Sequence, residues 1–239
     1  MTHACARSRG FTLVEVLVAV AAMALLAVMA WRGLDAMGRA QTQTRERSED
    51  VLTLQAGLSQ WRADLDAVTQ LAPVGGVDFD GRVLRITRNA LVSDPATVAV
   101  PEPGAPAGTG SSIRVVAWGT RQIDGKRQWL RWQSPAVRTR DELQAAWQQA
   151  ALWGQNPTDA LRRNEVVIVG VDEWQVFYFR NDSWSSPMSS ATAIGAASAS
   201  VQSPLPDGVR LVLTLSDGQV LSGRLLHDWV RPTLGVARS

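Results

Sequence analysis

One carboxylate stands out in this sequence because an apolar segment surrounds it. Glu15 is the fifth residue of the run Phe11–Trp31, in which only Thr12 and Glu15 interrupt the apolar character. An ionised carboxylate at bilayer depth costs about 2.5–3.5 kcal/mol on insertion scales, so an acid in this position indicates a function. The chemistry open to it is an ion pair with a cation that also lies in the membrane.

The candidate cation is the α-amino group that cleavage after Gly10 would create on Phe11. Glu15 lies four residues along the chain from that terminus, so its carboxylate suits the amine of a neighbouring subunit better than its own. A buried acid that pairs with a buried base in another chain can fix the register between stacked helices. We therefore expect cleavage between Gly10 and Phe11, and an assembly charge pair between Glu15 and the Phe11 amine.

Catalytic and metal-binding patterns are weak elsewhere in the chain. Without residues 1–10, His227 is the only histidine, and no G-x-S-x-G motif supplies a serine nucleophile. Its neighbour Asp228 and its place at the end of a predicted strand favour a structural role. The segment Asp78–Gly81 has two carboxylates but not the ligand number of an EF-hand loop, so a turn is the better interpretation. No phosphate-binding loop or dinucleotide fingerprint is present. We expect no enzyme activity, no cofactor and no metal.

The run Phe11–Trp31 has the length and composition of a transmembrane helix. Its 21 residues contain no basic residue and no proline, and they would extend about 31 Å, close to the hydrocarbon thickness of a bilayer. A Sec signal peptide and a plain signal anchor are the alternatives, and Ala22-Met23-Ala24 could serve as a cleavage site for the first. A carboxylate is unfavourable in the core of a signal peptide, which favours an assembly helix.

Charge and cysteine content exclude several classes of protein. Arg7 and Arg9 precede the apolar run, and without them 22 basic residues face 22 acidic ones, so the high pI does not indicate nucleic-acid binding. Cys5 is the only cysteine and lies in the same leader, so the processed chain would have neither a disulfide nor a thiolate site. Arg32 and Arg39 follow the run, and the positive-inside rule therefore does not decide the orientation.

After the span, the sequence predicts that the helix continues to about residue 70. Apolar residues recur at spacings of 4, 3, 4 and 3 and form one stripe: Leu54, Leu58, Trp61, Leu65 and Val68. The charged residues are expected on the other faces: Arg45, Glu46, Arg47, Glu49, Asp50, Arg62, Asp64 and Asp66. This pattern predicts an amphipathic stalk helix that lies on a globular domain. A free coiled coil is the alternative, but the stripe lasts only about two heptads.

The remaining chain is predicted to be rich in β-structure. Alternation at period two predicts strands at 82–87 and 112–118, and Asp124-Gly125 predicts a hairpin turn between 119–123 and 127–132. Further strands are expected at 165–170, 174–179, 209–215 and 219–226, a short helix at 141–153, and loops at 93–111 and 181–206. Ten tryptophans are interpreted mainly as core residues, with a docking face for a partner as the alternative.

The segment Gly10-Phe11-Thr12-Leu13-Val14-Glu15 resembles the N-terminal motif of type IV prepilins, which the pseudopilins of type II secretion share. The resemblance implies cleavage after Gly10 by a prepilin peptidase on the cytoplasmic side, N-methylation of Phe11 by the same enzyme, and helical assembly through Glu15. It also implies a single-pass protein of the bacterial inner membrane, with a cytoplasmic N-terminus and a periplasmic C-terminal domain.

Within that family, the chain resembles the J-type minor pseudopilins. The body is too long for a typical H- or I-type subunit and too short for a K-type subunit. J-like segments occur at 31–35, 58–65, 169–179 and 205–210, whereas about 93–160 has no match. The family fold implied is α+β: a long N-terminal membrane-to-stalk helix packed on a C-terminal body of two antiparallel β-sheets. The domains expected are a leader (1–10), an assembly helix (11–31), a stalk (32–70) and a periplasmic domain (71–239).

The implied role lies at the tip of the pseudopilus, where minor subunits prime assembly and support protein export. The implied partners are I-type and K-type pseudopilins, extending to H-type and major subunits, with prepilin peptidase as the processing enzyme. Inner-membrane lipid surrounds the helix, and no nucleic acid is involved. A minor pilin of a type IV pilus is the first alternative, and a signal-anchored periplasmic binding protein or enzyme is the second.

Overall fold

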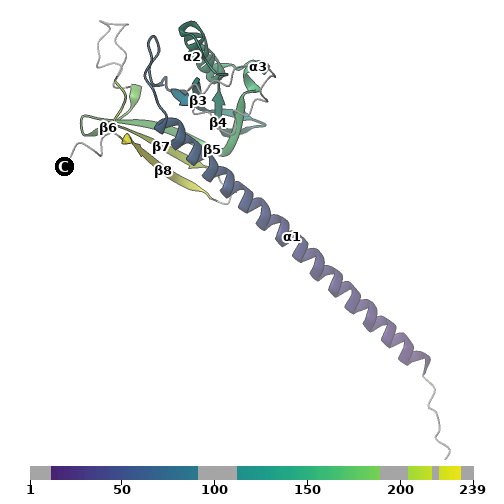
Figure 1. Ribbon diagram of the computed structural model, residues 1–239. Coiled ribbons are helices and arrows are strands. Elements are labelled where there is room, and N and C mark those ends of the chain that lie inside the picture. Colours follow the sequence, from purple (N-terminus) through teal and green to yellow (C-terminus); the bar gives the residue numbers. More distant parts are fainter. Residues whose placement is uncertain (1–11, 91–111, 189–203, 217–220, 233–239) are drawn as a thin grey trace, which may run out of the picture. The chain divides into compact units, whose positions relative to one another are not determined.

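The computed structural model describes residues 12–90, 112–188, 204–216 and 221–232. The chain forms two compact units, residues 1–49 and 50–239. Helix α1 (Leu13–Asp66) begins in the first unit and ends in the second (Figure 1). The sequence predicted this continuous helix, although it ends four residues earlier than expected.

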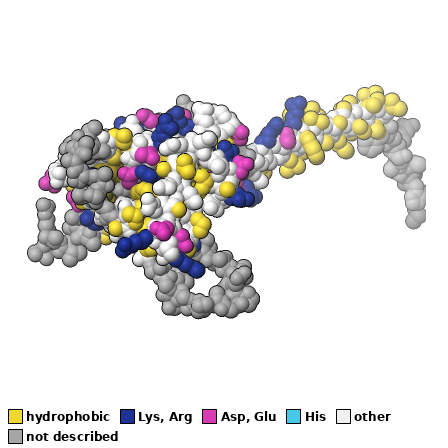
Figure 2. Space-filling model, turned by 90° about the horizontal axis from the view of Figure 1, so that it is seen from above, with side chains coloured by type: hydrophobic (Ala, Val, Ile, Leu, Met, Phe, Trp, Pro, Cys, Tyr) yellow, Lys and Arg dark blue, Asp and Glu magenta, His cyan; other side chains and the backbone are white. Residues whose placement is uncertain are grey.

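The first unit is the N-terminal part of α1, and its side chains are exposed and largely apolar. Figure 2 shows hydrophobic side chains along this part of the helix. Among the described residues, one helix is long and apolar enough to cross a membrane, and the apolar stretch lies near its N-terminus. The predicted long N-terminal apolar helix is therefore confirmed.

The body is an antiparallel β-structure. Its strands are β1 (Val77–Phe79), β2 (Val83–Ala90), β3 (Ser112–Ile123), β4 (Lys126–Gln133), β5 (Glu165–Arg180), β6 (Ser183–Ser185), β7 (Gly208–Leu215) and β8 (Gly223–Val230). Hydrogen bonding joins them in the order β1-β2-β3-β4-β5-β7-β8, and β6 also pairs with β5. The α+β class, with a long helix and an antiparallel body, is confirmed.

Strand β5 connects two sheets. The sequence predicted separate strands at 165–170 and 174–179, which is wrong, because one strand of 16 residues covers both. Its first part, Glu165–Gly170, pairs with β4, and its second part, Val171–Phe179, pairs with β7. A register shift between Val171 and Glu173 marks the change of partner. The two predicted sheets therefore share a strand.

Two helices cover opposite faces of the sheet that contains β2, β3 and β4. On one face, Leu84 and Ile86 of β2 pack in a cluster with Trp61 and Leu65 of α1. On the other face, Val83 joins a cluster with residues of α2 (Arg140–Gln155), whose buried side chains are Leu143, Ala146, Ala150 and Trp153. The short helix α3 (Asp159–Arg162) follows. The expected helix at 141–153 is confirmed, and Trp147 is partly buried against the same cluster.

Most of the predicted local structure is present. Asp124 (φ 50°) and Gly125 (φ 77°) form the turn between β3 and β4, in the left-handed conformation that such a hairpin requires. The last strand is displaced, since β8 spans Gly223–Val230 where 219–226 was predicted. The predicted loop 93–111 lies outside the described residues.

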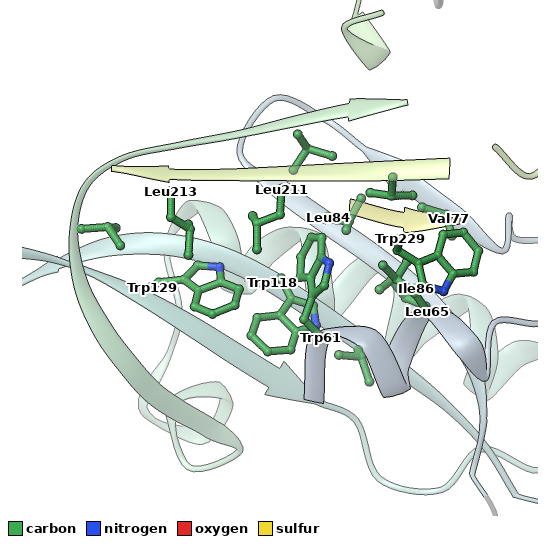
Figure 3. Close-up of a cluster of buried hydrophobic side chains, with 14 of the residues drawn as sticks. Trp61, Leu65, Val77, Leu84, Ile86, Trp118, Trp129, Leu211, Leu213 and Trp229 are labelled. Atoms are coloured by element: carbon green, nitrogen blue, oxygen red, sulfur yellow. The ribbon is translucent and has the colours of Figure 1, made fainter. Parts of the chain in front are cut away.

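A cluster of tryptophans forms the centre of the body. Trp61, Trp118 and Trp129 are fully buried, and the rings of Trp118 and Trp129 stack at 4.6 Å between centroids (Figure 3). Trp132 is fully buried on the other face of the sheet. The interpretation of tryptophans as core residues is confirmed for these four, whereas Trp174 is only partly buried.

Candidate assembly site

Glu15 lies in the first turn of α1, next to the helix N-cap. The backbone N–H of Glu15 donates to Thr12 Oγ1, and the backbone N–H of Thr12 donates to Glu15 Oε2, both at 3.4 Å. This reciprocal arrangement is a capping box, in which the carboxylate satisfies a backbone donor at the helix start. Both contacts are at the long end of the hydrogen-bond range, so they hold the carboxylate weakly.

The surroundings of Glu15 are apolar and supply no cation. Leu13, Val14 and Leu17 are each more than half exposed. Within the described residues 12–49, the ion pairs are Arg39–Asp35 and Arg45–Glu49, both farther along the helix. A cation for Glu15 must therefore come from outside these residues. Gly10 and Phe11, the predicted cleavage and methylation residues, lie outside the described residues, so the charge pair stays a prediction.

A second carboxylate on α1 has the opposite environment. Asp64 was predicted on a solvent-exposed face, which is wrong, because the residue is fully buried. Arg88 Nη1 donates to Asp64 Oδ1 at 2.6 Å, and Arg131 donates to both carboxylate oxygens at 2.8 Å. Trp118 Nε1 and Gln60 Nε2 each donate at 2.9 Å. Asp64 thus joins α1 to three strands, β2, β3 and β4.

This network makes the position of α1 on the body specific. The side chains of Arg88 and Arg131 are 8% and 11% exposed, so both ion pairs with Asp64 are shielded from water. A buried ion pair gains little net stability because desolvation opposes it, but loss of one partner leaves an uncompensated charge. The network therefore penalises any other register of the helix on the sheet. In the sequence, the only signal was the place of Asp64 at the margin of the apolar stripe, three residues after Trp61.

Two further contacts fix the C-terminal part of α1. Trp229 Nε1 of β8 donates to Asp66 Oδ1 at 2.7 Å. At Gly57 the helix comes so near to β5 that an added Cβ would lie 2.3 Å from Ile168 Cγ2. Glycine is therefore required at this crossing for steric reasons. The predicted stripe is confirmed here, since Leu54 is buried and Leu58 packs against the same core.

The other residues considered for chemistry have structural surroundings. His227 lies within β8, opposite Leu211, and not at the strand end as expected. Burial, and then the nearby charge of Arg62, lower the pKa of His227. Asp80 Oδ1 accepts from the backbone N–H groups of Arg82 and Val83 and closes a turn, as predicted. Among the described residues, no three His, Cys, Asp or Glu side chains gather as a metal site.

Comparison with known proteins agrees with the motif around Glu15. Residues 5–31 match the family model described as the prokaryotic N-terminal methylation motif. The type II secretion system protein J of Klebsiella pneumoniae is 45% identical over 62 residues, which cover 26% of this chain and 31% of that protein. The chain resembles the J-type pseudopilins. The match spans less than a third of that relative's length.

Proposed function

We propose that the chain is a minor pseudopilin of the type II secretion system, which joins the pseudopilus tip with other minor subunits, primes assembly and supports protein export. The observation that carries the proposal is Glu15. It lies in a helix that matches the N-terminal methylation motif, and the described residues supply it with no cation. An ionised carboxylate in the hydrocarbon of a bilayer costs free energy unless assembly provides a cation that pairs with it.

In this proposal, the chain is a single-pass inner-membrane protein with its body in the periplasm. Prepilin peptidase cleaves after Gly10 and methylates the new amino group of Phe11. The amine of one subunit then pairs with the Glu15 carboxylate of another. The body supports this role because α1 is fixed to it through a buried ionic network, so a force applied to the helix is passed to the β-structure.

The mass of the N-terminal peptide of the mature protein tests the processing step. The full chain is expressed in a strain with an active prepilin peptidase, and the purified protein is digested and analysed by mass spectrometry. An N-methylated Phe11 is the expected terminus. A chain that begins at Met1, or near Leu25 as signal-peptide cleavage would give, contradicts the proposal. Gly10→Leu is the matched control and should remain unprocessed.

Copurification tests the J-type assignment. The full chain is solubilised in detergent together with tagged I-type and K-type pseudopilins of the same system. We expect it to copurify with both, because the resemblance to the J type implies a complex with I-type and K-type partners at the tip. Copurification with neither would exclude a J-type role and would favour a different minor subunit.

A further inference from the structure

The inner face of β8 lies against the C-terminal part of α1. Leu225 and Trp229 pack in the core cluster that α1 also enters, and Trp229 Nε1 donates to Asp66 of α1 at 2.7 Å. Successive side chains of a strand point to opposite faces, so His227, which lies between these two, shares their face. It stands opposite Leu211 of β7, which is fully buried in the same cluster. His227 therefore lies in the contact between β8 and the helix.

The half-buried ring of His227 has surroundings that oppose a positive charge. Among the described residues, no group forms a hydrogen bond with its buried Nε2 atom. The neighbouring residues on the inner face of β7, Val209 and Leu213, are fully buried and apolar. Arg62 of α1 adds a positive charge close to the ring. Burial and a nearby cation both favour the neutral imidazole.

The carboxylates around this contact are engaged with other groups. Asp228 favours the charged ring, but only as the smallest of three influences. It belongs to the other face of β8, where Arg210 donates to both of its oxygens at 2.7 Å. Asp66 accepts the indole N–H described above and lies 3.7 Å from Arg62. Asp64 is enclosed by the donors of its own network. A second proton on His227 would therefore be poorly compensated.

We propose that His227 is an acid-sensitive contact, and that protonation of its ring loosens β8 from α1 while the rest of the body stays folded. β8 is suited to this role because it is the last strand of the sheet order and, among the described residues, pairs with β7 alone. Local opening of such a strand requires less free energy than global unfolding. Histidine is the side chain whose ordinary charge change falls between pH 5 and 8.

The direction of the pH effect follows from the two states of the strand. Burial, and then the charge of Arg62, lower the pKa of His227 while β8 is docked. In the open strand the pKa returns to its ordinary value of about 6.5. The open state then binds more protons, so docking is fully favoured above about pH 6.5 and weakens as the pH falls below that value. The inference goes beyond the proposed function, and its test uses neither Phe11 processing nor copurification.

Hydrogen exchange of the full chain in detergent micelles tests the opening of β8. The chain carries His3→Gln and is purified without a histidine tag, so that His227 is its only histidine. Protection factors, corrected for the intrinsic exchange rate, are compared at pH 7.5 and pH 5.5. We expect β8 to lose several-fold protection and the hairpin of β3 and β4 to keep its own. No change in β8, or an equal loss in both regions, would overturn the proposal.

Substitutions assign the effect to the ring. His227→Gln stays neutral at both pH values, and it should abolish the pH-dependent loss of protection in β8. His227→Phe is a second neutral variant, in case the amide does not pack there, and tryptophan fluorescence at pH 7.5 shows which variants are folded. Leu226→Gln is the matched control, since Leu226 is 54% exposed on the same strand, and it should keep the full effect. A pH effect that survives in a folded His227 variant would contradict the inference.

An NMR titration measures the same group without altering it. The full chain with His3→Gln is labelled selectively at histidine, and the imidazole signal is followed from pH 8 to pH 4.5. We expect a pKa below the ordinary value for His227 and a rise towards that value in Arg62→Gln. Arg47→Gln, at an exposed arginine of the same helix, should leave the pKa unchanged. A pKa at or above the ordinary value in the unaltered body would overturn the proposal.

Discussion

Two carboxylates near opposite ends of helix α1, Glu15 and Asp64, have opposite surroundings. Glu15 lies among exposed apolar side chains, and its described contacts are weak ones with Thr12. Asp64 is fully buried, where two arginines, a tryptophan and a glutamine donate hydrogen bonds to it. Both carboxylate oxygens of Asp64 therefore accept hydrogen bonds, whereas the carboxylate of Glu15 has only long contacts with Thr12.

The difference shows how one helix can serve two purposes. Where the body supplies the cations, the carboxylate fixes the helix to its own chain, because removing a partner would leave a buried charge. Where the chain supplies none, the carboxylate is available to another chain. Changes at the Asp64 end should therefore alter the stability of the body, whereas changes at the Glu15 end should alter assembly alone. Four substitutions test this division, ordered by their expected effect on body stability.

Asp64→Asn should have the largest effect. The change removes the negative charge and leaves the two buried arginines uncompensated, which costs about 3–5 kcal/mol of unfolding free energy. The measurement is urea denaturation of the full chain in detergent micelles, followed by tryptophan fluorescence. Asp50→Asn is the matched control, since Asp50 is exposed on the same helix. A loss no larger than that of the control would mean that the network does not hold α1 on the body.

Gly57→Ala should have the next largest effect. The added methyl group would clash with Ile168 Cγ2 and lie 3.3 Å from Trp129, so the helix or the Ile168 side chain must shift. Overpacking of this kind costs about 1–3 kcal/mol. Gly38→Ala is the control: nothing lies within 4 Å of its added carbon, and its better helix propensity should be neutral or stabilising.

A second substitution tests whether the loss of stability in Gly57→Ala is steric. Ile168→Ala removes the methyl group that the new side chain would meet, so the double variant should lose less than the sum of the two single variants. Such non-additivity is expected only for residues in contact. Additive losses would indicate that the cost at Gly57 arises elsewhere.

Trp229→Phe should have a smaller effect. It removes the donor to Asp66 but keeps an aromatic ring, and because Asp66 is partly exposed, the expected loss is about 1 kcal/mol. Trp174→Phe serves as the control for the change of ring, since Trp174 is likewise packed against the core. A loss at Trp229 equal to that of the control would show that the hydrogen bond contributes nothing.

Glu15→Ala or Glu15→Val should leave the stability of the body unchanged within the error of measurement. Cleavage after Gly10 should also continue, because the change lies beyond the cleavage site. Incorporation into the pseudopilus should be impaired, since the amine of a neighbouring subunit loses its partner. Cross-linking to neighbouring subunits measures incorporation, and yields equal to those of the unchanged chain would contradict the charge pair.

Several features of the fold could be predicted from the sequence because their signals are local. The apolar stripe of Leu54, Trp61 and Leu65 repeats at helical spacing, and Asp124-Gly125 is the dipeptide that a tight hairpin requires. Other features could not be predicted. The sequence around Val171 suggested a break between two strands, yet β5 continues through it, because pairing with β4 and then with β7 supports both parts.

The sequence by itself determined that a long apolar helix with a carboxylate near its start precedes an antiparallel β-body, since composition and periodicity are properties of neighbouring residues. The tertiary structure alone decided that Asp64 is buried while Glu15 is exposed. The partners of Asp64 lie far along the chain, at Arg88 and Arg131, and Trp229 reaches Asp66 from near the other end. Periodicity can identify the apolar face of a helix, but a polar residue at its margin is buried only where distant strands bring donors to it.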